Sequence, residues 1–373
     1  MRQSLLLVGL VAISFVAYCW PADTNLNGAK AKQTAKSKQD ASAKKDGKSR
    51  QETEKKGPVA RNDAKSRGIP DVFVLSKPYL SWLIAITMFA IGLMLPMKEV
   101  KQVVQRWPSV LAGTAVQYSS MPLLAFLLSL PILFHLNDEY YIGFMLVGCV
   151  PGAMASNVLT LNAKGNASYS VSLTTSATIL SPIVVPLTLA AVLAGQDRID
   201  NDIFIASSIK LLWIVVLPVV SGFVFGRFLL PKSSERIVNR AGSLIANLVI
   251  LWIIAVIVAL NRNRPMPPVN LVLALLSLNM LGYTVGYCAA RQLKLPEGMR
   301  RALTLEVGMQ NAGLGATLAT VLFATSETLQ AEVIAVAPAI YTFGCMFTGT
   351  VLAAIWAMFP ADVEEGAAEK SDP

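Results

Sequence analysis

The run Val150-Pro151-Gly152-Ala153-Met154-Ala155-Ser156-Asn157 interrupts an apolar stretch of the chain with a proline, a glycine and polar side chains. A second interruption of this kind, Glu306-Val307-Gly308-Met309-Gln310-Asn311-Ala312-Gly313, lies in another apolar stretch. Backbone groups freed at membrane depth must be covered by protein or line a cavity. The two runs therefore predict a pair of broken helices, which is the sequence pattern of a transporter with inverted repeats.

The composition of the chain indicates a membrane protein. Of its 373 residues, 54% are hydrophobic and 15% are charged, and the mean hydropathy is +0.54. Since soluble domains are less apolar, we expect an all-α membrane protein in a lipid bilayer. A spanning helix needs about 20 mostly apolar residues. The chain then has nine such blocks: Ser76–Met97, Val110–Leu133, Tyr141–Leu161, Tyr169–Ala194, Ile203–Phe228, Ala241–Leu260, Leu271–Ala290, Ala302–Ala324 and Val333–Met358.

The N-terminal part of the chain is interpreted separately. Leu5–Trp20 is apolar and short, so residues 1–22 are either a signal peptide or a tenth span. Residues 23–72 are poor in apolar side chains and predict a disordered basic segment. Residues 23–68 of this segment carry about +7 of the formal charge of +9, so the basic balance does not indicate a nucleic-acid partner. Residues 73–359 form the transporter domain, and residues 360–373 form a tail.

The charges of the loops orient the predicted spans. Lys and Arg collect in one set of alternate loops, and short loops rich in these residues lie in the cytoplasm. We therefore expect a multi-pass protein of the cell inner or plasma membrane with a cytoplasmic C-terminus and an extracytoplasmic basic segment. That segment runs against the positive-inside tendency. The cytoplasmic set is Lys98, Lys101, Arg106, Lys164, Lys232, Arg236, Arg240, Arg291, Lys294, Arg300 and Arg301.

Polar residues gather at the two interruptions. Glu306 lies well inside a predicted span, where a charge is costly unless it is paired or hydrated. Gln310 follows one turn later, Ser156 and Asn157 lie at the other interruption, and the next span places Ser170 and Thr174 one turn apart. Hydroxyl, amide, carbonyl and carboxylate oxygens are ligands for a hard cation. The set favours sodium over a proton relay, which would require further Asp, Glu or His in the membrane.

Simpler interpretations of these residues stay open on the sequence alone. A protonated Glu306 would serve as a hydrogen-bond partner between helices. Ser170 and Thr174 would bond to carbonyls of their own helix, as such hydroxyls commonly do. Gln117 is a lone polar residue in its span and faces either a neighbouring helix or the site. The four cysteines follow no disulfide or zinc pattern and are expected to be packing residues.

Both interruptions resemble the motifs of the bile acid:sodium symporter (BASS) family. The run Gly148-Cys-Val-Pro-Gly-Ala-Met-Ala-Ser-Asn-Val-Leu-Thr-Leu, with Ala163-Lys-Gly-Asn, Ser170, Thr174 and Leu180-Ser-Pro after it, looks like the first motif. Glu306-Val-Gly-Met-Gln-Asn-Ala-Gly-Leu looks like the second. The resemblance implies 9–10 transmembrane helices in two inverted five-helix repeats, divided into a panel and a core domain, with two broken helices that cross in the core.

The resemblance also implies two Na⁺ ions, as co-transported ligands, and the residues that hold them. One site would use Ser156, Asn157, Ser170, Thr174 and Glu306. The other would use Gln117, Glu306, Val307, Met309 and Gln310, with backbone oxygens from Val307 and Met309. Asn311, Met154 and Ala155 would face the substrate. Met154 stands where family members often have a small hydroxyl residue.

The predicted function is sodium-coupled symport of a small organic anion, such as a bile-acid-like compound, a pantothenate-like compound or a 2-keto acid. The alternative is a sodium-independent carrier of an organic acid or oxyanion with a related fold. An intramembrane enzyme is not expected, because His135 is the single histidine and no metalloprotease or aspartyl motif is present. No obligate protein partner is expected.

Overall fold

Helices account for the regular structure in the computed structural model of the protein. It describes residues 2–19, 72–76, 79–93, 107–130, 133–193, 213, 217–228, 235–323 and 329–359. Within these ranges no strand forms, and the one extended pairing is an isolated bridge. The helices are α1 (Arg2–Cys19), α3 (Val72–Leu75), α4 (Leu80–Leu93), α6 (Trp107–Leu128), α7 (Asp138–Cys149), α8 (Ala155–Asn162), α9 (Ala167–Leu193), α11 (Leu217–Phe228), α12 (Glu235–Asn261), α13 (Val269–Gln292), α14 (Glu297–Gly308), α15 (Ala312–Leu322), α16 (Ala331–Ile334) and α17 (Val336–Ala357).

Several of these helices have the length and composition of membrane spans. Three stretches qualify unaided, namely Trp107–Leu128, Val269–Gln292 and Ala331–Ala357. A fourth qualifies if Ala167–Ser181 and Ile183–Leu189, which meet at 64°, are taken as one span. The predicted spans that contain the two interruptions are each divided into two short helices, α7 with α8 and α14 with α15. An all-helical fold with apolar helices, as expected for a membrane protein, is confirmed.

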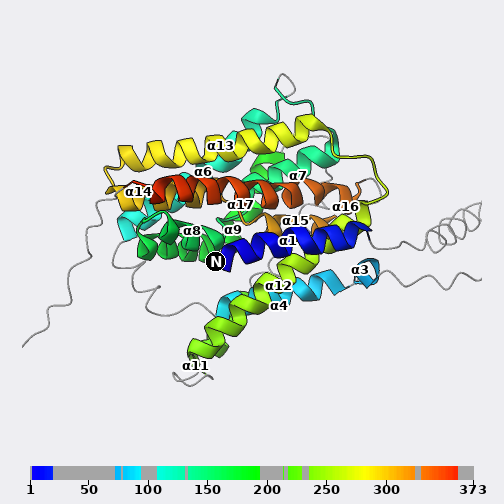
Figure 1. Ribbon diagram of the computed structural model, residues 1–373, viewed down its shortest axis with the longest axis horizontal. Helices are drawn as coiled ribbons and strands as arrows, with labels where there is room; N and C mark the ends of the chain where they lie inside the picture. Colours follow the sequence, from blue (N-terminus) through cyan, green and yellow to red (C-terminus); the bar gives the residue numbers. More distant parts are fainter. Residues whose placement is uncertain are drawn as a thin grey trace, which may run out of the picture.

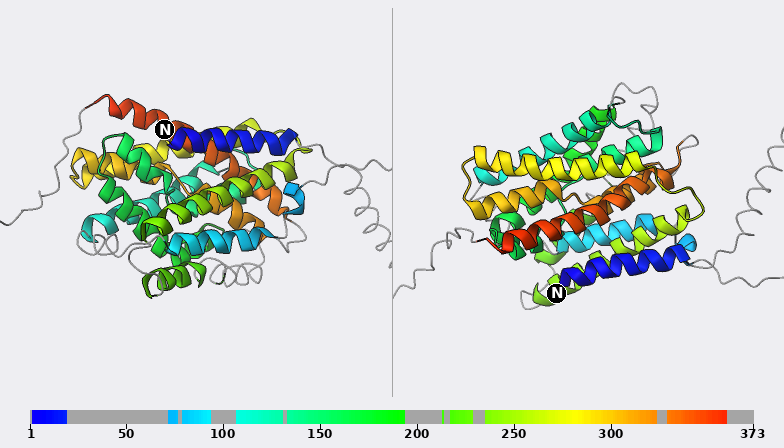
Figure 2. Two further views of the ribbon diagram at one scale, coloured as in Figure 1. Left: turned by 60° about the horizontal axis from the view of Figure 1, so that its bottom comes forward. Right: turned by 45° about the horizontal axis from the view of Figure 1, so that its top comes forward.

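The helices pack in two groups. In one group α4 packs against α11 and α12, and α1 and α3 pack against α12. In the other, α13 packs against α14, α6 and α17, while α8 and α9 pack against α14. Figures 1 and 2 show α1, α4 and α12 lying together along one side of the molecule. α15 connects the two groups, because it contacts α4 and α12 as well as α17.

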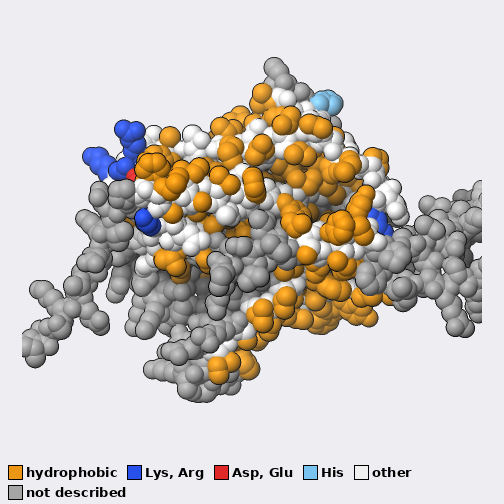
Figure 3. Space-filling model, viewed as in Figure 1, with side chains coloured by type: hydrophobic (Ala, Val, Ile, Leu, Met, Phe, Trp, Pro, Cys, Tyr) orange, Lys and Arg blue, Asp and Glu red, His pale blue; other side chains and the backbone are white. Residues whose placement is uncertain are grey.

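The outer surface of the described helices is largely apolar. Hydrophobic side chains cover much of the face in Figure 3, and the blue Lys and Arg side chains gather at the ends of the molecule. On α13, Leu273 and Leu276 are 49% and 45% exposed, and on α17 Phe347 is 62% exposed. Apolar helix faces of this kind are suited to lipid.

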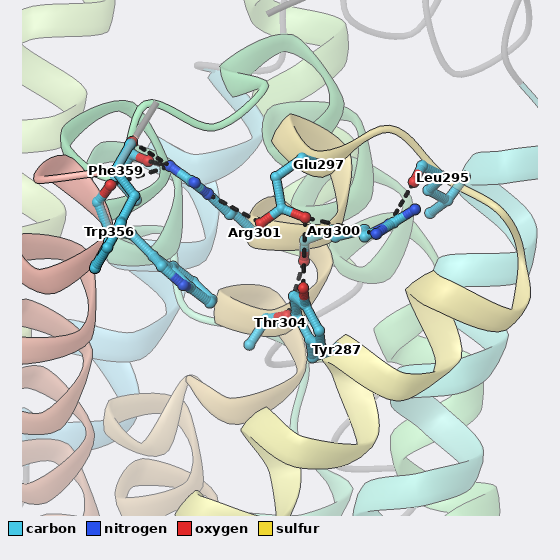
Figure 4. Close-up of polar contacts among 9 residues, drawn as sticks. Tyr287, Leu295, Glu297, Arg300, Arg301, Thr304, Trp356 and Phe359 are labelled. Carbon is cyan, nitrogen blue, oxygen red and sulfur yellow. Dashed lines mark hydrogen bonds and ion pairs between the residues drawn. The ribbon is translucent and has the colours of Figure 1, made fainter. Parts of the chain in front are cut away.

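The ends of α8, α14 and α17 meet at a buried arginine (Figure 4). Arg301, 3% exposed, donates from Nη1 to the carbonyls of Ala163 at 2.8 Å, Trp356 at 3.1 Å and Phe359 at 3.4 Å. Its Nε donates to Glu297 across 3.2 Å. The positive charge thus lies at the C-terminal ends of α8 and α17, where a cation is stabilised.

This arrangement corrects one sequence expectation. The span Ala302–Ala324 was expected to begin after Arg300 and Arg301, which were counted among the loop charges. Both arginines are in fact helical, because α14 begins at Glu297, and Arg301 is buried. Three other expected loop charges are helical as well, namely Arg236 and Arg240 in α12 and Arg291 in α13. Arg301 therefore belongs to the helix packing and is not a loop charge that orients the bundle.

Some expectations fall outside the described residues. They include the basic segment 23–72 up to residue 71, the tail 360–373, the loop charges at Lys98, Lys101, Arg106 and Lys232, and most of the predicted span Ile203–Phe228 before α11. Whether residues 1–22 are cleaved stays a prediction, although α1 forms a helix that packs against α12 and α17.

Candidate functional site

The two interruptions predicted from the sequence are breaks between helices, and they meet. α7 ends at Cys149, because Pro151 disfavours a helical conformation at Val150, whose φ and ψ are −76° and 157°. α14 ends at Gly308, and Met309 is extended with φ −107° and ψ 93°. Gly152 and Gln310 then pair as an isolated antiparallel bridge.

Hydrogen bonds across this crossing satisfy backbone groups that the breaks set free. The N–H of Ala153 donates to the carbonyl of Met309 across 2.7 Å, and the N–H of Asn311 donates to the carbonyl of Pro151 across 2.7 Å. A broken helix at membrane depth is tolerated when protein satisfies its backbone in this way. Each break thus depends on the other for its stability.

The carboxylate of Glu306 lies at this crossing in the last turn of α14. It is fully buried. Its Oε2 accepts hydrogen bonds from Ser156 Oγ across 2.5 Å and from Thr174 Oγ1 across 2.8 Å. The three residues come from α14, α8 and α9, so the carboxylate joins both broken helices to a third helix.

Asn157 extends this cluster of oxygens. Its Oδ1 accepts from Ser170 Oγ at 2.8 Å and from Thr174 Oγ1 at 3.1 Å. Thr174 Oγ1 also lies 3.1 Å from the carbonyl of Ser170, so the back-bonded interpretation holds in part alongside the contacts to Glu306 and Asn157. The structure brings together the whole predicted first set, Ser156, Asn157, Ser170, Thr174 and Glu306.

The predicted second set contains buried polar atoms that lack partners. Gln117 and Gln310 are each 1% exposed. The other oxygen of the carboxylate, Glu306 Oε1, makes no hydrogen bond within the described part of the chain, and neither do Gln310 Oε1 and both side-chain polar atoms of Gln117. Such orphaned atoms are rare in protein interiors and indicate a group that the protein binds there.

Gly152 shows that Gln117 and Glu306 face one place. A Cβ atom built on Gly152 would overlap the Glu306 carboxylate and would lie 3.1 Å from Gln117 Nε2. The amide oxygen of Gln117 exchanges places with this nitrogen after a half-turn of the terminal side-chain bond. The absence of a side chain at Gly152 thus allows the α7–α8 break to lie against the Glu306 carboxylate and the Gln117 amide, whose Oε1 oxygens have no hydrogen-bond partner among the described residues.

The backbone members of the second set are engaged in this conformation. The carbonyl of Val307 accepts from Gln310 Nε2 across 2.8 Å, and the carbonyl of Met309 accepts from Ala153. A carbonyl oxygen has two lone pairs, so each retains the capacity for a further ligand.

The chemistry of both sets fits sodium, which would be carried as a substrate. The oxygens are supplied by carboxylate, amide, hydroxyl and carbonyl groups, which are the ligands of hard cations. By contrast, the described residues hold no group of three or more His, Cys, Asp or Glu that suits a transition metal.

The three residues expected to face the substrate are among the accessible residues of the crossing. Met154 is 41% exposed, and Ala155 and Asn311 are half-buried. α8 begins at Ala155 and α15 begins at Ala312, so the positive ends of two helices meet here. Asn311 Oδ1 accepts from the N–H of Leu314 and caps α15.

A polar group behind the crossing was missed by the sequence interpretation. Asn279 of α13 and Tyr341 of α17 both donate to the carbonyl of Gly308. The signal that could have found Asn279 is that it is the lone amide in its predicted span, as Gln117 is a lone polar residue in its own.

Comparison with known proteins identifies relatives along most of the chain. The model of the "Sodium Bile acid symporter family" matches residues 81–266. An "Uncharacterized sodium-dependent transporter YocS" of Bacillus subtilis (strain 168) is 33% identical over 291 residues, which are 77% of this chain and 85% of that protein.

Two further relatives come from plants and animals. The protein of Arabidopsis thaliana named "Probable sodium/metabolite cotransporter BASS1, chloroplastic" is 31% identical over 274 residues, covering 73% of this chain and 65% of that protein. The "Ileal sodium/bile acid cotransporter" of Homo sapiens is 28% identical over 290 residues, covering 75% of this chain and 80% of that protein. All three alignments are longer than the family match, and each covers about three quarters of this chain.

Proposed function

The chain belongs to the sodium bile acid symporter family, and from this premise we propose that it couples the transport of a small organic anion to sodium. Its relatives are named as transporters and cotransporters, so the expectation of a transporter and not an enzyme is confirmed. We further propose that two sodium ions bind, that the substrate is a monoanion, and that transport occurs by alternating access.

The observation that carries the proposal is the unequal use of the two oxygens of Glu306. Oε2 accepts from Ser156 and Thr174, in the cluster that also contains Asn157 and Ser170. Oε1 has no partner among the described residues and faces the side of Gly152 and Gln117. One carboxylate thus borders two sets of oxygens, and a sodium ion in each set would share it.

The first sodium ion is held by the Oε2 side of this carboxylate and the second by the Oε1 side. The first set is Ser156, Asn157, Ser170, Thr174 and Glu306, and the second is Gln117, Glu306, Val307, Met309 and Gln310. A sodium ion bound in one set holds the Glu306 carboxylate in the position that the other set requires. Binding of the first ion therefore strengthens binding of the second, and sodium activation is cooperative. The C-terminal, partially negative ends of α7 and α14 lie at the crossing and also favour cations there.

The substrate is a monoanion by charge balance. Two sodium ions bring two positive charges, and Glu306 offsets one of them. The buried arginine of α14, Arg301, is engaged with helix ends and Glu297. A carboxylate or sulfonate therefore completes the neutral assembly, bound at the N-terminal ends of α8 and α15 beside Met154, Ala155 and Asn311.

Transport proceeds by alternating access. The group of α6, α8, α9, α13, α14 and α17, together with α7 and the connecting helix α15, is the core domain, and the group of α1, α4, α11 and α12 is the panel domain. The matching order of α6–α7–α8–α9 and α13–α14–α15–α17 around the two breaks supports inverted repeats. Movement of one domain against the other exposes the crossing to each side of the membrane in turn.

The orientation places the 291–296 end of α13 in the cytoplasm and the 262–268 end outside, with a cytoplasmic C-terminus in the cell inner or plasma membrane. Single cysteines test this orientation in a background without the four native cysteines. An impermeant maleimide added outside should label Met266→Cys and should not label Lys294→Cys. The reverse labelling pattern would invert the topology.

The transport function is tested by uptake of radiolabelled organic acids into proteoliposomes. The acids should include a bile acid, a short 2-keto acid, a pantothenate-like acid and a neutral amide of each. We expect one or more monoanions to accumulate with an inward sodium gradient and not with a potassium gradient. The neutral amides should not accumulate. Equal accumulation with potassium would instead support the sodium-independent carrier.

A further inference from the structure

Behind the crossing, a buried group of polar side chains from α13 and α17 takes no part in the proposed sodium sites. It consists of Asn279 and Tyr283 on α13 with Tyr341 and Thr348 on α17. Asn279 and Tyr341 are only 2% and 1% exposed. Buried amides and hydroxyls need hydrogen-bond partners. The partner that Asn279 and Tyr341 share therefore indicates their role.

That shared partner is the carbonyl of Gly308, the last residue of α14. In an unbroken helix this carbonyl would accept a hydrogen bond from the N–H of residue 312. Here the N–H of Ala312 donates to the backbone carbonyl of Gln310 across 2.7 Å. Gly308 instead accepts from Asn279 Nδ2 and from Tyr341 Oη, each at 2.7 Å. Two donors from two helices thus occupy the oxygen that the break exposes.

Thr348 fixes the orientation of the Asn279 amide. Its Oγ1 donates to Asn279 Oδ1 across 2.6 Å, which turns the amide nitrogen towards Gly308. Tyr283 Oη lies 3.2 Å from the same hydroxyl. The group is therefore a connected network, and two of its members, Asn279 and Tyr341, donate hydrogen bonds to Gly308 at the break.

Close packing transmits this restraint to the backbone of α14. A Cβ atom on Gly282 would lie 3.1 Å from the Cα of Gly308, and one on Gly286 would lie 3.0 Å from the Cα of Thr304. A Cβ atom on Gly308 itself would overlap the ring of Tyr283. The two glycines of α13, one turn apart, thus let its backbone lie directly against the last turn of α14.

The proposed ligands of the second sodium ion flank the restrained carbonyl. Val307 precedes Gly308, and Met309 and Gln310 follow it, while the carbonyls of Val307 and Met309 already take part in the crossing. The peptide plane that carries the Gly308 carbonyl also carries the N–H of Met309. Turning this plane changes ψ of Gly308 and φ of Met309, the dihedral angles that join it to the planes carrying the Val307 and Met309 carbonyls.

We propose that Asn279 and Tyr341, oriented by Thr348, are positioning residues for the second sodium ion. They hold the Gly308 carbonyl towards α13 and α17, so that the backbone of Val307 and Met309 and the side chain of Gln310 keep the geometry that sodium requires. This role rests on the proposed function and extends it to residues that do not touch the ion.

The experiment measures sodium affinity apart from transport. Purified protein is heated in detergent over a NaCl series, with choline chloride to hold ionic strength constant, and the sodium concentration that gives half of the stabilisation is determined. In Tyr341→Phe and Thr348→Val this concentration should rise about three- to tenfold, the equivalent of one lost hydrogen bond. Asn279→Leu should show a larger rise. In proteoliposomes, the substrate KM at saturating sodium should stay unchanged.

Matched variants separate positioning from general damage. Thr348→Ser keeps the hydroxyl and should restore the wild-type sodium concentration. Thr342→Val on α17 and Thr284→Val on α13 remove hydroxyls that, among the described residues, bond only within their own helices, and these variants should respond as the wild type does. These two controls match the test variants in helix and in chemistry.

Two results would overturn the inference. One leaves the proposed sodium sites intact, and the other overturns those sites as well. If sodium stabilises the wild type, and Tyr341→Phe and Thr348→Val respond at the same concentrations, then only the positioning role is wrong. If sodium gives the wild type no stabilisation beyond that of choline, the proposed sodium sites are wrong and the inference falls with them.

Discussion

Gly152 lies against the carboxylate of Glu306, so that any side chain on the glycine would overlap the acid. The two residues belong to different broken helices, and the backbone pairing of Gly152 with Gln310 holds them in register. This contact is the point where the crossing of the helices and the proposed ion binding depend on each other.

Adding one methyl group at this position should therefore displace the acid. In Gly152→Ala the carboxylate must move from its place beside Gln117, and we expect sodium-stimulated uptake to fall by at least about tenfold. The control is Gly344→Ala on α17, because a Cβ atom there meets no described residue within 4 Å. Wild-type sodium stimulation in Gly152→Ala would contradict the described approach of the two breaks.

Removing the charge of Glu306 should abolish coupling without loss of the fold. Glu306→Gln keeps the size of the side chain but removes the charged ligand that both proposed sites share. Sodium-dependent uptake should be lost while the variant inserts into the membrane and elutes as the wild type does. Glu139→Gln, which changes a carboxylate in the first turn of α7, should transport normally. Sodium-dependent uptake at the wild-type rate in Glu306→Gln or Glu306→Ala would refute the site assignment.

Substitution of Thr174 should weaken the binding of one of the two proposed sodium ions. In Thr174→Ala the first set loses a hydroxyl that contacts both Glu306 and Asn157. The sodium concentration for half-maximal uptake should rise about fivefold, and the Hill coefficient should fall from above one towards one. The control is Ser172→Ala on the same helix, because Ser172 Oγ donates to the carbonyl of Ser168 in its own helix. A wild-type sodium response in Thr174→Ala would remove Thr174 from the site.

Arg301 should matter for stability and not for sodium affinity. Arg301→Met removes the charged donor that the carbonyls of Ala163 and Trp356 and the carboxylate of Glu297 share. We expect a loss of about 2–4 kcal/mol in unfolding free energy, seen as a lower thermal midpoint in detergent. Arg300→Ala removes a more exposed contact to Glu297 and one hydrogen bond to the carbonyl of Leu295, and it should lower the midpoint by less. Equal midpoints for the two variants would contradict this account.

The sequence predicts the helices and breaks of the described region well, because their causes are local. Long apolar runs give α9 and α13 within a few residues of the expected spans Tyr169–Ala194 and Leu271–Ala290. Pro151 and Gly152 indicate the first break, since proline and its preceding residue disfavour a continuing helix. Glu306 was predicted to act in the site because a carboxylate in an apolar span is costly.

Other features depend on tertiary contacts that local patterns do not encode. Arg301 resembles a loop charge in the sequence, but it is buried because the ends of α8 and α17 supply carbonyls for it. Asn279 is a lone amide in its span, and the sequence does not show that its partner is a carbonyl on another helix. The assignment of Gln117 to the site was implied by the family resemblance and stays a prediction, supported by its nearness to Gly152.

The most direct measurement of coupling follows ²²Na⁺ and a radiolabelled anion into the same proteoliposomes. We predict that a transported monoanion accelerates ²²Na⁺ influx, that external sodium accelerates anion influx, and that both accelerations vanish together in Glu306→Gln. Anion influx that is equally fast without sodium, or that brings no ²²Na⁺ with it, would contradict sodium-coupled symport.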